Sequence, residues 1–356
     1  MKKMSSSTKS LLLKLTALLL ALCMMPALSL ADDESTGEAD WLSFVLVCNE
    51  GMQNDGGNVG NTMMVVSMNP TLGKIRLLEF TWDTFINYEG YDVPQKIDMA
   101  YRNNGPEETM KVFNQNFGTD IKLYMSLNYS NLASLIDNYG GVTVDVSRAE
   151  RNALNSMVAS KKDSLQAQAD AGFLNQLMIE MLAQDYYLDD FGPETHLNGL
   201  QAVGYGWLQY DSVYNCCLRE SEVVSNLFAS VASTLSDQII FYNQASGYPT
   251  NVNGRRAIDV DAITEEDEAF LRQLIGPMFQ MAYHNLTEDD ILTITLALAH
   301  SAYNASRQGV NIFSAVEYKV FPLEALQDYD IVAGTKGHLI DSEANGEAIR
   351  AFLYGE

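Results

Sequence analysis

The feature that most constrains the fold is an alternation of short apolar runs with amphipathic segments between residues 42 and 146. Short apolar runs bounded by Asn, Gly or Pro are typical of buried strands, and a spacing of three or four between apolar residues is typical of helices. The expected strands are 42–47, 63–68, 75–80, 123–127 and 142–146, and the expected helices are 107–117 and 130–139. Because strands separated by helices form mainly parallel sheets, we predict an α/β fold with a central mixed, largely parallel sheet and helices on both faces.

Most of the remaining chain has helical patterning. Residues 148–190 are mostly helical in character, with apolar residues at amphipathic spacing between 173 and 182. The pattern leaves two interpretations open, one more packed helix or a lid or wall of an apolar tunnel. Further helices are expected at 217–234, 265–283, 289–305 and 342–354, and a late strand at 316–320. We predict a single domain over 41–356 with a helical insertion at about 148–192.

The first 31 residues have the pattern of an export signal. Three lysines among the first nine residues precede an apolar run at 11–30, which is the order of a signal peptide. Small residues near Ala31 favour cleavage after it, and a retained N-terminal anchor is the alternative. Residues 32–40 are short and acidic, as expected of a tether. We therefore expect an exported, extracytoplasmic protein, secreted or membrane-anchored, that works close to the membrane.

The charge of the chain excludes nucleic acid as a partner. The sequence holds 22 basic and 46 acidic residues, and removal of residues 1–31 leaves 18 basic residues against the same 46 acids. Binding to a phosphate backbone needs clustered Lys and Arg. No expected helix carries such a stripe, so a DNA-binding role is not predicted.

Six motifs stand in a fixed order along the chain. They are TMMVVSMNP at 62–70, DT at 83–84, KIDMAY at 96–101, GPE at 105–107, GGVTVDV at 140–146 and LNGLQA at 197–202. In order and spacing they resemble the LytR-CpsA-Psr (LCP) family, over roughly residues 44 to 354. The resemblance implies transfer of a glycopolymer from a polyprenyl pyrophosphate carrier to peptidoglycan, usually with magnesium. Such chemistry needs arginines and a metal ion at the phosphates, and an apolar tunnel for the lipid.

The chain departs from this family at its charged positions. Trp82, Trp207, Gln209 and Cys216 stand where the family has arginines, and Asn61 stands in place of an aspartate. Each lost arginine removes a charge-assisted contact worth roughly 1.5 to 3 kcal/mol. The resemblance therefore implies a weakened pyrophosphate site.

The surviving charged residues are the site candidates that the resemblance implies. Asp83 and Arg219 are the catalytic candidates, and Asp83 with Asn61 would hold Mg²⁺ only weakly, because one carboxylate makes a poor site. The ligand-binding candidates are Asn61, Trp82, Lys96, Asp98, Arg102, Trp207 and Gln209. The alternative is that Asp83 caps a turn and Arg219 pairs with Glu222 on a helix surface.

Two functions follow from the resemblance. One is an LCP-like envelope protein that binds a polyprenyl-(pyro)phosphate-linked glycopolymer but is catalytically impaired. The other is an active phosphotransferase that attaches wall or capsular glycopolymer to peptidoglycan. In either case we expect an apolar pocket whose mouth is formed by the loops at 49–61 and 210–215 and the turn at 82–83.

The cysteines add one expectation about this pocket. Cys48 stands where the family usually has a glycine, and Cys216 replaces an arginine, so both should face the pocket mouth. We predict a disulfide between them, since export supplies an oxidising setting. Free buried thiols, or pairing through Cys217, are the alternatives.

Overall fold

The computed structural model describes residues 41–49, 60–172, 186–242, 247–260, 262–322, 328–332, 334–340 and 342–355. The expected export signal and tether lie outside these residues, as do the apolar positions expected between 173 and 182. In the part of the chain that is described, no helix is both long and apolar enough to cross a membrane.

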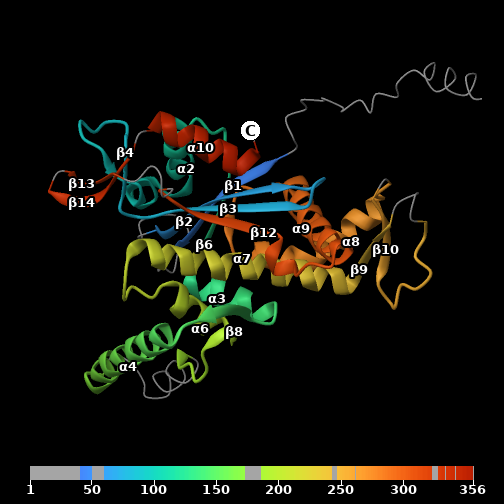
Figure 1. Cartoon of the computed structure of the whole chain (residues 1–356), viewed down its shortest axis with the longest axis horizontal. Coiled ribbons are helices and arrows are strands. Elements are labelled where there is room, and N and C mark those ends of the chain that lie inside the picture. The colour runs from blue at the N-terminus through green and yellow to red at the C-terminus, as the bar shows by residue number, and fades with distance from the viewer. Residues whose placement is uncertain are drawn as a thin grey trace, which may run out of the picture. The chain divides into compact units, whose positions relative to one another are not determined.

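A six-stranded mixed sheet forms the centre of the domain, in the order β11-β6-β1-β2-β3-β12 (Figure 1). Its strands are β1 (Leu42–Asn49), β2 (Gly60–Asn69), β3 (Lys74–Phe80), β6 (Leu123–Asn128), β11 (Tyr283–His284) and β12 (Val316–Phe321). The β1/β6 and β3/β12 pairs are parallel, whereas β1/β2, β2/β3 and β6/β11 are antiparallel. The prediction of a mixed sheet is confirmed, but the prediction that this sheet is largely parallel was wrong. The connections between β1, β2 and β3 are shorter than the dozen or so residues that a parallel crossover requires.

The strand at 142–146 also differs from its prediction. As β7 (Val142–Val146) it follows α3 (Tyr129–Asn138), but it does not return to the central sheet beside β6. It pairs antiparallel with β8 (Gly192–Leu197) in a separate two-stranded sheet. Its alternating burial explains this, because one face of β7 packs on the core while Thr143 and Asp145 do not. A strand of a parallel sheet is buried on both faces.

Helices cover both faces of the central sheet, as predicted. The helices α2 (Asp98–Phe117) and α10 (Ser342–Tyr354) pack on one face, and α7 (Val213–Gln238) and α9 (Glu288–Gln308) pack on the other (Figure 1). Strand β1 divides its side chains accordingly: Phe44, Leu46 and Cys48 join the core under α7, and Val45 and Val47 join the core under α2. This period of two is the strand geometry that the sequence pattern predicts.

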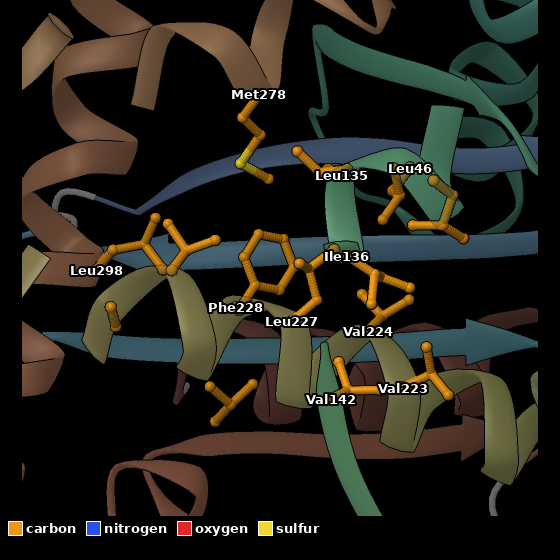
Figure 2. Packing of buried hydrophobic residues seen from close by; sticks show 14 of the residues in the cluster. Leu46, Leu135, Ile136, Val142, Val223, Val224, Leu227, Phe228, Met278 and Leu298 are labelled. Carbon is orange, nitrogen blue, oxygen red and sulfur yellow. The ribbon is translucent and has the colours of Figure 1, made fainter. Parts of the chain in front are cut away.

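The α7 side holds the larger core. Figure 2 shows Val224 and Leu227 of α7 among Leu46 of the sheet, Ile136 of α3 and Leu298 of α9. The N-terminus of α7 is capped by Ser212, whose side chain accepts a hydrogen bond from the backbone N–H of Asn215 at 3.1 Å. The 210–215 segment expected as a loop is therefore partly the first turn of this helix.

The remaining elements surround this core. They are β4 (Thr84–Ile86), β5 (Gln95–Lys96), α4 (Arg148–Asp170), α6 (Gly199–Gly206), β9 (Ile239–Tyr242), β10 (Arg256–Asp259), α8 (Glu265–Gln280), η1 (Ile312–Ser314), β13 (Asp328–Val332) and β14 (Thr335–Leu339). Helix α4 falls in the expected helical insertion and begins with a capping box between Ser147 and Glu150. The short strands beside β4 and β9 were not expected from the sequence.

Candidate functional site

A mainly apolar cavity of about 400 Å³ lies among α3, α4 and α6. Helix α4 contributes Met157, Val158 and Leu165 to its lining, and α6 contributes Val203 and Gly204. Two further lining residues, Lys161 and Lys162, are exposed, so that their ammonium groups lie at the rim. Its volume falls in the usual range for small-molecule sites. Helix α4 is therefore one wall of an apolar cavity, which was one of the two interpretations of the insertion.

The close packing of α6 on α3 fixes one side of this cavity. A Cβ atom placed on Gly199 would lie 1.9 Å from the carbonyl oxygen of Ala133, so only glycine fits at this position. The backbone N–H of Gly199 donates a hydrogen bond to Asp137 Oδ1 at 2.7 Å. Asn198 caps the helix and accepts from the N–H of Gln201. The LNGLQA motif thus locks the start of α6 against the end of α3.

The predicted mouth of the pocket was wrong. Trp82 is half-buried and packs against the core on the α2 side of the sheet, and none of the residues from 210–215 lines the cavity. Residues 50–59 of the expected loop lie outside the described residues. Helix α4, from the insertion, lines the cavity instead.

Trp207 is the predicted ligand-binding residue that the structure does place in the cavity. Its ring packs on Tyr129 with the ring centroids 4.5 Å apart. Both residues also line a second, much smaller void of about 20 Å³, together with Cys48, Thr62 and Glu220. The aromatic pair therefore stands between the large cavity and a polar region at the ends of the central strands.

That polar region contains a buried pair of carboxyl groups that the sequence did not reveal. Glu79 lies on the α7-facing side of β3 and is 0% exposed, and Glu220 of α7 is 6% exposed. Ser221 Oγ donates to Glu79 Oε2 at 2.7 Å, and Thr62 Oγ1 donates to Glu220 Oε2 at 2.7 Å. One visible signal was Glu79 itself, an acid whose neighbours on the same face of β3, Ile75 and Leu77, are apolar.

The two carboxyl groups perturb each other. Burial raises the pKa of Glu79 well above its usual value, and the neighbouring Glu220 raises it further. Burial likewise raises the pKa of Glu220. Two carboxyl groups in contact in a buried site cannot both be ionised without a counter-charge. In the absence of a cation, we therefore expect the pair to share a proton.

Arg219 is committed to other partners. Its guanidinium group forms two hydrogen bonds with Asp211, at 3.1 and 3.0 Å, and a longer contact of 3.4 Å with Glu150. It also donates to the carbonyl oxygen of Leu208, and its side chain is only 4% exposed. The alternative pairing with Glu222 on a solvated surface was wrong, because the fold brings Asp211 and Glu150 around this buried arginine.

The other predicted residues fall into separate places. Asp83 is buried, its Oδ1 atom has no hydrogen-bond partner among the described residues, and its charge acts on the Cys217 thiol. Asp98 forms an ion pair with Arg102 at 2.9 Å, and the Lys96 charge acts on the same carboxylate. Burial raises the pKa of Asp98 despite these two cations.

Gln209 and Asn61 are the two remaining candidates. Gln209 is exposed, although it follows the cavity-lining Trp207 by two residues. Asn61 belongs to β2, but its side chain lies outside the described part of the structure. The pairing of Asp83 with Asn61 as a magnesium site thus stays a prediction.

The predicted disulfide between Cys48 and Cys216 is not formed. Both residues, and Cys217, are free and buried. Cys216 Sγ lies 3.4 Å from the carbonyl oxygen of Gly206 and 3.8 Å from Glu220 Oε1, so the thiol is turned toward these acceptors. Burial raises the pKa of all three thiols. Cys48 and Cys216 therefore lie at the same polar region, as the prediction assumed, but as two separate thiols.

Comparisons with known proteins agree on one family. The LytR_cpsA_psr family model matches residues 35–233, more than half of the chain. The chain is 29% identical over 120 residues to the polyisoprenyl-teichoic acid–peptidoglycan teichoic acid transferase TagU of Oceanobacillus iheyensis. That match covers 32% of this chain and 36% of the relative, so the chain matches only about a third of the relative's length.

Solved structures with the same fold include two Tag proteins. TagV from B. subtilis has a TM-score of 0.55 at 13% identity, over 88% of this chain and 98% of that chain. TagT bound to LIIa-WTA has a TM-score of 0.54 at 13% identity, over 90% of this chain and 92% of that chain. At these identities the likeness shows the fold alone.

Proposed function

This chain belongs to the LytR-CpsA-Psr family, and on that premise we propose that it binds a polyprenyl-phosphate- or polyprenyl-pyrophosphate-linked glycopolymer with impaired catalysis. It would act outside the membrane in the cell envelope, next to peptidoglycan. The observation that carries the proposal is the apolar cavity among α3, α4 and α6 with two lysines at its rim.

The cavity suits an amphiphile with an apolar chain and an anionic end. Its wall of Met157, Val158, Leu165 and Val203 offers aliphatic surface to a hydrocarbon. The ammonium groups of Lys161 and Lys162 at the rim would attract the phosphate. The names of TagU, a polyisoprenyl-teichoic acid transferase, and of TagT bound to LIIa-WTA support a lipid-linked polymer as the ligand class.

Impaired catalysis follows from the state of the charged residues. Phosphoryl transfer needs free arginine or metal charge at the oxygens that become more negative. Arg219 is already neutralised by Asp211 and Glu150. The nearby carboxyl pair, Glu79 and Glu220, adds acidic groups rather than cations. In its described part, this region therefore lacks the free positive charge that phosphoryl transfer requires.

The surroundings of Asp83 fit a magnesium ion only in part. Asp83 has a buried carboxylate oxygen with no hydrogen-bond partner among the described residues, as a cation ligand would. It would supply one oxygen, with further ligands from solvent and phosphate. When bound, Mg²⁺ would neutralise phosphate charge. An active phosphotransferase, the alternative function, depends on this ion.

A matched pair of cavity variants tests the binding site. Leu165→Trp places a larger ring at a half-buried lining position, and Ser164→Trp places the same ring at the exposed neighbouring position on α4. Calorimetric titration with a short-chain prenyl pyrophosphate should show binding at least about tenfold weaker in the first variant and unchanged in the second. Equal affinities in both variants would place the ligand outside the cavity.

The same probe separates the two functions. We expect no enzymatic phosphate release from the prenyl pyrophosphate in the presence of Mg²⁺. Release that disappears in Asp83→Ala would instead establish the active phosphotransferase.

A further inference from the structure

We propose that Glu79, Glu220 and Cys217 form a binding site for one divalent transition-metal ion such as Zn²⁺. A carboxylate oxygen from each acid and the sulfur of Cys217 lie within 4.8 Å of one another, and all three residues are buried. The acids and the thiol come from β3 and α7, two elements that the core holds rigidly. This site is independent of the proposed lipid binding and separate from the magnesium candidate at Asp83.

The carboxylates are oriented as metal ligands usually are. Ser221 holds one oxygen of Glu79, and Thr62 holds one oxygen of Glu220, each at 2.7 Å. The second oxygen of Glu79, Oε1, is fully buried and has no donor at hydrogen-bonding geometry among the described residues, and the Glu79 carboxyl group interacts with both Glu220 and the Cys217 thiol. Hydrogen bonds from outside the coordination sphere commonly fix ligating carboxylates in this way.

The charge of the cluster also calls for a cation. Buried ionised carboxyl groups are costly unless they are paired or bind a metal ion. The adjacent cation on α7, Arg219, is taken by Asp211 and Glu150. Binding of a divalent ion would replace the protons that the carboxyl pair and the thiol hold without it, because metal ligands must be deprotonated.

The donor set selects the type of metal ion. A thiolate together with carboxylates suits Zn²⁺ or Co²⁺, whereas Mg²⁺ and Ca²⁺ prefer oxygen ligands alone. We expect a water molecule as the fourth ligand, and the void of about 20 Å³ that Glu220 and Thr62 line is large enough for one. Four ligands would complete the coordination that Zn²⁺ favours.

Titration of the metal-stripped full chain with Co²⁺ tests this site. We expect saturation at one ion per chain, a near-ultraviolet charge-transfer band from thiolate to Co²⁺, loss of the band on adding Zn²⁺, and release of two protons per ion in weak buffer. Cys217→Ser should remove the band, and Glu79→Gln should weaken binding at least about tenfold. Ser221→Ala, which removes only the supporting hydroxyl group, should weaken it about 10- to 100-fold.

Cys48→Ser is the matched control, because Cys48 is an equally buried thiol beside the same void but outside the three ligands. It should keep both the band and the affinity. The proposal is overturned if the folded wild-type chain gives no charge-transfer band, or if the band survives in Cys217→Ser. Co²⁺ bound without a thiolate band means surface carboxylates only, and also overturns it. If Cys217→Ser fails to fold, absence of the band in the wild-type titration still overturns the proposal, and loss of the band in Cys48→Ser would assign it to the wrong thiol and overturn it as well.

Discussion

Replacing both Glu79 and Glu220 with glutamine tests whether the buried pair holds a proton when no metal ion is bound. Glutamine keeps the side-chain length and the acceptor oxygens for Ser221 and Thr62, which each donate at 2.7 Å. It removes both titratable groups. Because burial raises the pKa of Glu79 well above its usual value, and also raises that of Glu220, the native protein retains a proton that the unfolded chain releases.

The sign and size of the effect follow from proton linkage. Above about pH 4.3, the usual glutamate pKa, the native state binds one more proton than the unfolded state. The free energy of unfolding contributed by the pair therefore falls as pH rises, by about 1.4 kcal/mol per pH unit, until pH passes the raised native pKa. At every pH below the raised native pKa, the double variant should gain about 1.4 kcal/mol per pH unit relative to wild type.

Urea unfolding followed by tryptophan fluorescence, in chelator at pH 5, 6, 7 and 8, measures this gain. The variant-minus-wild-type difference removes the titration of the other acidic groups. Glu317→Gln, at an exposed carboxylate on β12 that contacts Arg76, should give a small difference with no such slope. If the difference in free energy of unfolding between the double variant and wild type is the same at every pH, the pair holds no shared proton and the prediction is refuted.

Three other predictions concern the supports of the site. Arg219→Met should lower the free energy of unfolding by about 3 to 5 kcal/mol, because it leaves two partly buried carboxylates without their cation. The control Arg307→Met, at an exposed position, should change the free energy of unfolding by less than about 0.5 kcal/mol. Gly199→Ala should cost at least about 1 to 3 kcal/mol in urea unfolding because its Cβ would overlap Ala133. Gly276→Ala, with open space at its Cβ, should instead stabilise α8 by about 0.4 to 1 kcal/mol. The three described cysteines should resist a thiol reagent in the native protein and all react in urea without reductant; two missing labels would restore the predicted disulfide.

Local patterning predicted the elements far better than their pairing. The apolar periodicity located β1, β2, β3 and α10 closely, because burial of one face leaves a direct mark on sequence. The direction of neighbouring strands is marked only by the length of their connection, and the short connections between β1, β2 and β3 were the sign of antiparallel pairing that the prediction did not use. The alternation in β7 did carry the information that this strand is buried on one face only, but its length and apolar content resemble those of a strand in the main sheet.

Of the candidate site, only features set by residues close in sequence could be predicted. The period of two already placed Glu79 on the same side of its strand as Ile75 and Leu77. That this side would meet Glu220, 141 positions later, depends on how α7 crosses the sheet, which no local pattern specifies. The pairing of Arg219 was missed for the same reason, since Glu150 reaches it from the insertion.

The acidic pair also determines where an anionic ligand can bind. At an effective dielectric constant of 20, a single phosphate charge about 5 Å from an ionised carboxylate meets a repulsion of about 3 kcal/mol. A pyrophosphate beside Glu220 would need free arginines to offset this repulsion, and Arg219 is already occupied. The rim of the cavity, with Lys161 and Lys162, has the opposite charge. In the proposed complex, the same electrostatics that would draw a divalent cation to the carboxyl pair would therefore direct the phosphate of a lipid-linked ligand to the lysines.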